Sequence, residues 1–237
     1  MTISKLSKGS ILSPNHYNGR AYKITRITIH EMAAVWTADR CGEWFKSQTR
    51  IASSNYGIGN DGKIMCYVEE QNAAWTSADW DNDNRAITIE VSNSYMGGDW
   101  PISDAAYKSL VALCADLHKR YGIPVQYKGY PADGHTEHKM FYNTACPGPY
   151  IHNLLASGKL INDIKKAMNQ EGELVATKEE MKQIAQYSAE YVYGDADKKA
   201  NLNMYNATHW GYLNTKKLVE RVAAIEKKLD AVLAKLE

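Results

Sequence analysis

The sequence has no long apolar run and almost no excess charge of either sign. No segment approaches the roughly 20 consecutive apolar residues that span a bilayer, so we expect no membrane span. The 28 Lys and Arg residues nearly balance the 27 Asp and Glu residues, which gives a net charge of +1. Proteins that bind nucleic acid generally need a basic surface, so nucleic acid is excluded as the main partner. The first residues contain no apolar core of a signal peptide, and we expect synthesis in the cytoplasm without one.

Cysteine is also scarce, and its four copies form no Cys-x-x-Cys pair. In a chain of 237 residues without a signal sequence, reduced thiols are the default, so disulfides are not expected. Cys114 shares helical spacing with Leu110 and Leu117, which predicts a core position. Cys146 precedes a Pro-Gly pair, and its sequence position alone allows a core thiol, a nucleophile or a metal ligand.

Hydrophobic periodicity predicts an α/β fold. Residues 22–32 and 85–94 alternate between apolar and polar side chains, so each is predicted to be a strand with one buried face. The Asp-Gly pair at 61–62 predicts a hairpin, because such turns need a positive φ. Residues 123–147 are predicted to form a long loop of the kind that carries function. Helical spacing recurs in three segments: 37–47, 103–120 and 148–169.

Both predicted strands carry an ionisable residue on the polar face, His30 in ITIH and Glu90 in ITIE. If the strands are neighbours, both side chains project from the same face of the sheet. His138 and Cys146 follow in the predicted loop, eight positions apart. Two imidazoles and a thiolate are a natural zinc set that leaves a fourth position for water. A nearby Glu can then act as general base.

These residue types alone leave simpler interpretations open. A His or Glu at the end of a strand is usually exposed or hydrogen-bonded. The spacing between His138 and Cys146 is also wider than in most structural zinc motifs. Four other histidines compete as ligands on these grounds: His16, His118, His135 and His152.

Four segments carry more specific motifs, in this order: ITIHEMA, ASSNYGIGNDGKI, AAWTSADWDNDNRAITIEVSN and EHKMFYNTACPGPYI. Together they resemble the zinc-dependent N-acetylmuramoyl-L-alanine amidases of the peptidoglycan recognition protein superfamily, especially bacteriophage endolysins. The resemblance runs from His30 to Pro149, about half of the chain. It implies a mixed central β-sheet flanked by helices, with zinc in a groove on one face.

The resemblance also implies a reaction and a place of action. Members of this family hydrolyse the amide bond between N-acetylmuramic acid and the L-alanine of the stem peptide. The implied partner is therefore bacterial peptidoglycan. An endolysin made in the cytoplasm would act on the cell wall after holin-mediated release.

Individual residues match the positions of the family's functional residues. His30, His138 and Cys146 match the three zinc ligands. Glu90 matches the acidic residue with which some members activate water. Thr144 falls where relatives carry Lys or Thr to polarise the carbonyl and stabilise its oxyanion.

The sequence departs from the family pattern at two positions. Asn55 stands where many relatives have His, and Thr76 stands where many have His after a Trp. These differences leave open which residue near 54–56 acts as a second acid or base.

Two other classes of protein are alternatives. In a Cys–His cell-wall peptidase, Cys146 would be the nucleophile and His138 its base. Such nucleophiles often lie at a helix N-terminus, whereas Cys146 is predicted to follow a loop and precede a proline. That interpretation also leaves His30 and Glu90 without a role. A non-catalytic peptidoglycan-binding module on the same fold commonly lacks the cysteine ligand, so Cys146 favours the enzyme.

The composition changes near residue 170. We predict a catalytic domain at 1–170, a polar linker at 171–176 and a helical region at 177–237 that serves oligomerisation or wall binding. The last helix is expected to make a homo-oligomer, because six apolar residues follow the a/d spacing of a coiled coil. These residues are Leu218, Val222, Ile225, Leu229, Val232 and Leu236. The segment NLNMYNATHWGYLN suits either a wall-binding surface or a turn packed on helices.

Overall fold

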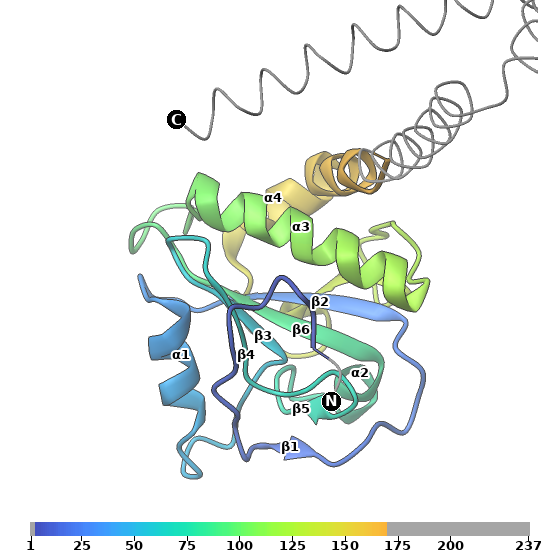
Figure 1. Ribbon diagram of the computed structural model, residues 1–237. Coiled ribbons are helices and arrows are strands. Elements are labelled where there is room, and N and C mark those ends of the chain that lie inside the picture. The colour runs from blue at the N-terminus through green and yellow to red at the C-terminus, as the bar shows by residue number, and fades with distance from the viewer. Residues whose placement is uncertain (1–2, 170–237) are drawn as a thin grey trace, which may run out of the picture. The chain divides into compact units, whose positions relative to one another are not determined.

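The computed structural model describes residues 3–169, and a five-stranded mixed β-sheet forms the centre of this region (Figure 1). β2 pairs in parallel with both β6 and β7, and β3 pairs in parallel with β6. β4 runs antiparallel to β3 at one edge. The expected mixed α/β architecture is therefore confirmed. The strands, in their order across the sheet, are β4 (Ile64–Cys66), β3 (Tyr56–Ile58), β6 (Ala86–Val91), β2 (Arg26–Glu31) and β7 (Gly134–Glu137).

Apolar residues of the two central strands face a helical layer. The layer contains α3 (Asp104–Tyr121) and α4 (Gly148–Ala156), which lie above the sheet in Figure 1. Burial of each isoleucine contributes about 1.5–3 kcal/mol relative to exposure. This face therefore fixes which way every residue of β2 and β6 points. Four isoleucines of the two strands are fully buried in the shared core: Ile27, Ile29, Ile87 and Ile89.

α3 begins and ends at recognisable signals. The Ser103 hydroxyl caps the helix by accepting a hydrogen bond from the Ala106 N–H at 3.0 Å. Gly122 follows the last turn in the left-handed conformation, with φ of 65°. The inner stripe of the helix includes Leu110 and Cys114, both fully buried. The core position predicted for Cys114 is confirmed.

The predicted hairpin and first helix are also present. β3 and β4 pair around a turn in which Gly62 has φ of +81°. α1 (Ala38–Phe45) begins after Thr37, whose hydroxyl accepts a hydrogen bond from the Arg40 N–H at 3.2 Å. Its buried side packs on Tyr67, which follows β4.

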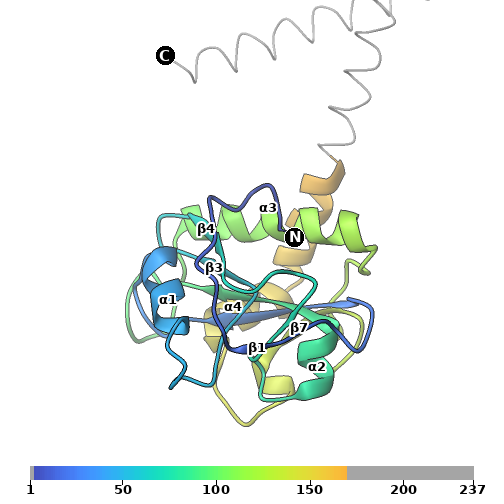
Figure 2. The same cartoon turned by 60° about the horizontal axis from the view of Figure 1, so that its bottom comes forward.

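The opposite face of the sheet is polar and carries a second, smaller layer. Fully buried threonines lie on this face, among them Thr28 of β2. α2 (Trp80–Arg85) covers them, and its Asn82 donates from Nδ2 to the Thr28 hydroxyl at 3.0 Å. Figures 1 and 2 show α2 on the other side of the sheet from α3. β1 (His16–Tyr17) and β5 (Ala73–Ala74) form a separate antiparallel pair.

The prediction of a long loop over residues 123–147 was wrong. Gly134–Glu137 form β7, which extends the sheet at one edge, and His138–Met140 form a short 3-10 helix, η1. The residues GHTE show no apolar alternation, so pairing with β2 decides their conformation rather than their own propensity. The expected helix over 148–169 is divided, because Gly158 at φ of +75° separates α4 from helical residues 159–169.

Other predictions concern the C-terminal part of the chain. The linker at 171–176, the helical region at 177–237 and the coiled-coil seam from Leu218 to Leu236 lie outside the described residues. Within residues 3–169, no helix combines the length and apolar character needed to cross a bilayer.

Candidate metal centre and active site

His30 and Glu90 occupy opposite positions on neighbouring parallel strands. β2 and β6 are neighbours, the condition on which the sequence placed the two residues on one face, and their register pairs His30 with Glu90. Both lie on the polar face, because the buried isoleucines beside them fix the alternation. Neighbouring strands lie about 5 Å apart, so the two side chains leave the sheet close together. The imidazole and the carboxylate therefore project side by side near the carboxyl ends of the two strands.

His138 and Cys146 reach the same place from the segment after β7. β7 pairs with β2 on the side away from β6, and His138 begins η1 directly after it. The backbone then loops out and returns, with the Lys139 N–H donating to the Cys146 carbonyl at 3.0 Å. This hydrogen bond closes the segment and explains how a separation of eight positions brings the two side chains together.

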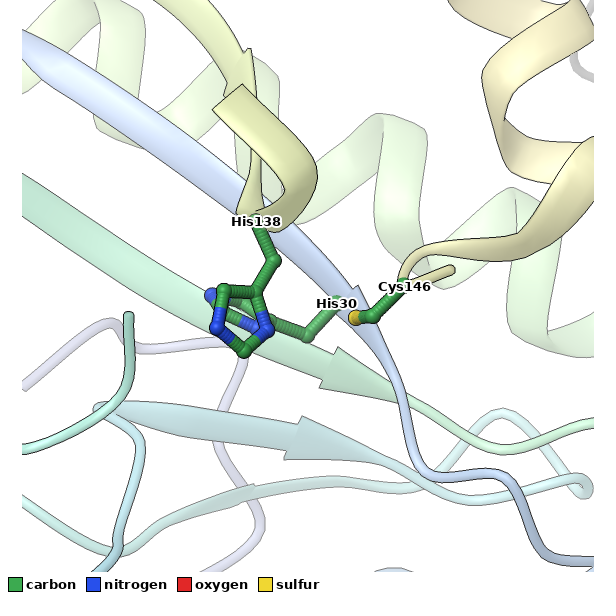
Figure 3. A group of neighbouring side chains, drawn as sticks. All are labelled: His30, His138 and Cys146. Carbon is green, nitrogen blue, oxygen red and sulfur yellow. The ribbon is translucent and has the colours of Figure 1, made fainter. Parts of the chain in front are cut away.

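The side chains of His30, His138 and Cys146 converge in one group (Figure 3). One possible donor atom from each lies within 4.8 Å of the other two, and the two imidazole centroids are 4.5 Å apart. In residues 3–169, no other three His, Cys, Asp or Glu side chains form such a group. Two imidazoles and a thiolate, with a fourth position open, are a ligand set typical of catalytic zinc. The donor set therefore fits a zinc ion.

Unpaired buried polar atoms support that fit. Nε2 of His30 and Oε2 of Glu90 are both buried, and neither has a hydrogen-bond partner in the described part of the chain. Buried polar atoms are nearly always satisfied, and an exception often marks an ion or a water. A cation and its water at this site would supply such partners.

Burial sets the protonation states of Glu90, His30 and Cys146. Desolvation, and next the charge of Glu31, raises the pKa of Glu90 to about 8. Burial, and next the neighbouring His138, lowers the pKa of His30 far below its usual range, so its imidazole is neutral and able to bind a cation. Burial and nearby carboxylates, Glu90 foremost, raise the pKa of the Cys146 thiol. A bound cation would lower the pKa of both Glu90 and Cys146, because positive charge favours the carboxylate and the thiolate.

Glu31 contacts the segment that carries Cys146. Its backbone N–H donates to Cys146 Sγ at 3.4 Å, and its carboxylate accepts from Asn93 Nδ2 at 3.1 Å. A Cβ added to Gly148 would lie 2.7 Å from Glu31 Oε2, and Gly148 has φ of +78°. The positive φ therefore favours glycine two residues after the cysteine, and a larger residue would also displace the Glu31 carboxylate.

Thr144 lies beside the same ligand. Its Oγ1 accepts a hydrogen bond from the Cys146 N–H at 3.2 Å, which holds the turn before the cysteine. The hydroxyl proton has no acceptor among residues 3–169 and is free to be donated to another oxygen. The oxyanion role of Thr144 stays a prediction.

Sequence reasoning missed the backbone contact made by Ser77. Burial lowers the pKa of the His138 imidazole, and a hydrogen bond with the Ser77 backbone opposes this shift. No residue type in TSAD signals such a contact. The two departures from the family pattern have structural partners. Asn55 is fully buried, and its Nδ2 donates to the Val68 carbonyl at 3.1 Å. The Thr76 and Thr88 hydroxyls lie 2.9 Å apart.

The competing histidines lie elsewhere in the structure. His118 of α3 and His135 of β7 form a buried pair with 2.8 Å between their Nε2 atoms. His152 contacts the Glu137 carboxylate at 3.0 Å, and His16 belongs to β1. None of them belongs to the metal-binding group.

The environment of Cys146 disfavours a nucleophile. As predicted, Cys146 follows a non-helical segment and precedes Pro147, which is the N-cap of α4. Reactive cysteines need a lowered pKa, whereas burial and nearby carboxylates raise that of Cys146. Such surroundings suit a thiolate whose charge a cation balances.

Comparison with known proteins agrees with this geometry. The structure is similar to that of a mutant of PlyL, with 17% identity, a TM-score of 0.53 and coverage of 68% of this chain and 99% of that chain. It is also similar to the PlyG catalytic domain, with 20% identity, a TM-score of 0.51 and coverage of 68% and 94%. At these identities the similarity shows the fold alone. No curated protein gives a significant sequence match. The family profile described as N-acetylmuramoyl-L-alanine amidase matches residues 20–149, more than half of the chain, and the chain therefore belongs to that family.

Proposed function

We propose that this protein is a zinc-dependent amidase that hydrolyses the bond between N-acetylmuramic acid and L-alanine in bacterial peptidoglycan. The observation that carries the proposal is the convergence of His30, His138 and Cys146 beside the buried carboxylate of Glu90. Membership of the amidase family supports the choice of substrate and bond. We further propose that it is an endolysin, which acts on the cell wall after holin-mediated release.

The group of side chains is suited to hold the ion in a fixed place. His30, His138 and Cys146 would be the ligands, and burial keeps the His30 imidazole neutral. The Glu31 N–H and the backbone bond from Lys139 hold the cysteine in position. Zinc bound here would lower the pKa of water towards ~7 and polarise the scissile carbonyl.

Glu90 is the residue best placed to move protons. It lies opposite His30. Its Oε2 has no hydrogen-bond partner in the described structure, so this oxygen is free to accept a hydrogen bond from the attacking water. A carboxyl whose pKa is raised by burial can hold the proton and then give it to the leaving amine. The free hydroxyl proton of Thr144 would be donated to the carbonyl oxygen as negative charge develops there.

Removal and return of zinc test this function. Protein treated with EDTA should lose peptidoglycan hydrolysis and recover it with one equivalent of zinc. Full activity in excess EDTA would contradict the proposal and favour Cys146 as a nucleophile. A zinc-loaded protein that binds peptidoglycan but releases no product would favour a binding module. Cys114→Ala, a change in the core away from the site, serves as control and should respond to zinc like wild type.

A further inference from the structure

A buried carboxylate, Asp83, has no part in the reaction proposed above. Asp83 is in α2 and only 4% exposed. It accepts three hydrogen bonds: from the Ser77 N–H at 2.9 Å, the Ser77 hydroxyl at 2.6 Å and the Thr76 N–H at 3.1 Å. A buried carboxylate is costly unless it is paired and hydrogen-bonded. These donors, and the nearby Arg20 guanidinium, offset that cost.

The turn that Asp83 holds has an unfavourable backbone conformation. Ala78, the residue after Ser77, has φ of +54°, in the left-handed region that residues with a Cβ rarely adopt. Such a conformation persists only where surrounding contacts over-determine the backbone, and it is frequent at functional sites. The hydrogen bonds from Thr76 and Ser77 to Asp83 are contacts of this kind.

The same turn meets a ligand of the metal centre. Burial lowers the pKa of His138, and a hydrogen bond with the backbone of Ser77, the residue that donates to Asp83 through two atoms, opposes this shift. His138 Nε2 is buried and has no hydrogen-bond partner among residues 3–169, so it is free for a metal ion. A histidine that binds metal usually has its other ring nitrogen held by a carboxylate or a backbone group, which fixes the tautomer and the ring orientation. Asn82 also stabilises the turn, because its Nδ2 donates a hydrogen bond to the Ser77 hydroxyl at 3.2 Å.

We infer that Asp83 is a positioning residue of the metal centre, which acts through the Ser77 turn to hold the His138 ring in its metal-binding orientation. The inference rests on the proposed zinc site and adds a residue that contacts neither metal nor substrate. Its loss should therefore weaken zinc binding first and lower hydrolysis only as a consequence.

The zinc dissociation constant of Asp83→Asn, measured on the full chain by competition with a chelator, tests the inference. An amide cannot accept all three hydrogen bonds, because its NH2 group would face a backbone N–H. Loss of such outer contacts typically weakens metal binding about 10–100-fold, and we expect a loss in this range. Asp81→Asn makes the same chemical change on an exposed side of α2 and should bind zinc as wild type does.

Two further variants separate positioning from a general loss of stability. Asp79 caps α2 by accepting from the Asn82 N–H at 2.7 Å, so Asp79→Ala should destabilise the helix while zinc affinity is retained. Ser77→Ala removes the hydroxyl that donates to Asp83 and accepts from Asn82, but it keeps the Ser77 N–H donor to Asp83. It should weaken zinc binding less than Asp83→Asn does, and it provides the test if that variant fails to fold.

The ring nitrogens of His138 give a spectroscopic readout in the zinc-free protein. Nitrogen-15 NMR should show a single tautomer in wild type and a mixture in Asp83→Asn. Unchanged zinc affinity in Asp83→Asn, or an equal loss in Asp79→Ala, would overturn the inference. Wild-type protein that binds no zinc would overturn the metal site itself, and the inference with it.

Discussion

His30 and Glu90 face each other across the parallel pairing of β2 and β6, each one residue before the end of its strand. The pairing sets a neutral imidazole beside a carboxylate whose pKa is raised to about 8. The same alternation that buries the isoleucines of ITIH and ITIE directs these two side chains to the other face. A one-residue shift of either strand would exchange its core and site residues, so the core and the site specify one register.

Replacement of Cys146 should separate a ligand from a nucleophile. Cys146→Ala should lose bound zinc, whereas Cys146→Asp should keep part of both zinc and activity, because a carboxylate can replace a thiolate as ligand. Elemental analysis of the purified variants measures the metal directly. One full equivalent of zinc retained by Cys146→Ala would contradict the assignment.

Glu90→Gln should fold and bind zinc but lose most of its hydrolysis. The amide has nearly the same shape as the carboxyl but cannot take up the proton of the attacking water. General-base catalysis contributes about 10²–10⁴-fold, so kcat should fall by that factor. Glu43→Gln, a change in an exposed carboxylate of α1, is the matched control. A loss of less than tenfold in Glu90→Gln would remove Glu90 from this role.

Thr144 should act through its hydroxyl proton. Thr144→Val keeps the shape but removes the donor and should lower kcat by about 10²-fold, the scale found when one oxyanion donor is lost. Thr144→Ser keeps the hydroxyl and its contact with the Cys146 N–H, so it should retain most of the activity. An equal decrease in kcat in Thr144→Val and Thr144→Ser would show that the reaction does not depend on the hydroxyl.

Stability should fall in mild acid because of the buried pair His118 and His135. Burial lowers the pKa of both imidazoles below 6.5, the value expected in the unfolded chain. The unfolded chain therefore binds more protons than the folded protein once the pH drops below about 6.5. The stability that the neutral pair contributes is present above that pH and is lost as the pH falls.

The double variant His118→Gln/His135→Gln tests this pH dependence. Its free energy of unfolding, measured in EDTA between about pH 5 and pH 8, should fall less steeply on acidification than that of wild type. The difference in slope can reach about 1.4 kcal/mol per pH unit for each proton involved. His16→Gln, outside both histidine groups, is the control. Parallel curves for wild type and the double variant would exclude the pair as the cause.

Strands with regular alternation could be predicted from the sequence, and so could the residues on their two faces. RITIHE and AITIEV form strands in the predicted orientation, and Ser103 and Thr37 cap helices as their types suggest. GHTE was not recognised as a strand, because its conformation depends on pairing with β2 and not on a local pattern. The helix of α2 was missed for a similar reason, since five polar residues after Trp80 show no apolar stripe.

The metal-binding group could be proposed from residue types and from the family resemblance, but its supporting contacts could not. The contacts of Asp83 with Ser77 and of Ser77 with His138 join residues whose approach depends on the sheet order. The position of Cys146 just before a helix was consistent with the helical spacing predicted from residue 148, but its contact with the Glu31 N–H was not predictable. Such relationships follow from tertiary packing rather than from any local pattern.

Mass spectrometry of digested peptidoglycan tests the central claim most directly. Zinc-loaded wild-type protein should release intact stem peptides with a free L-alanine amine and leave glycan strands with unsubstituted lactyl carboxyls. Zinc-free protein and Glu90→Gln should release almost none under the same conditions. Products that arise from cleavage within the stem peptide or cross-bridge, or between the sugars, would contradict the assignment of the metal-binding group and Glu90 as an amidase centre.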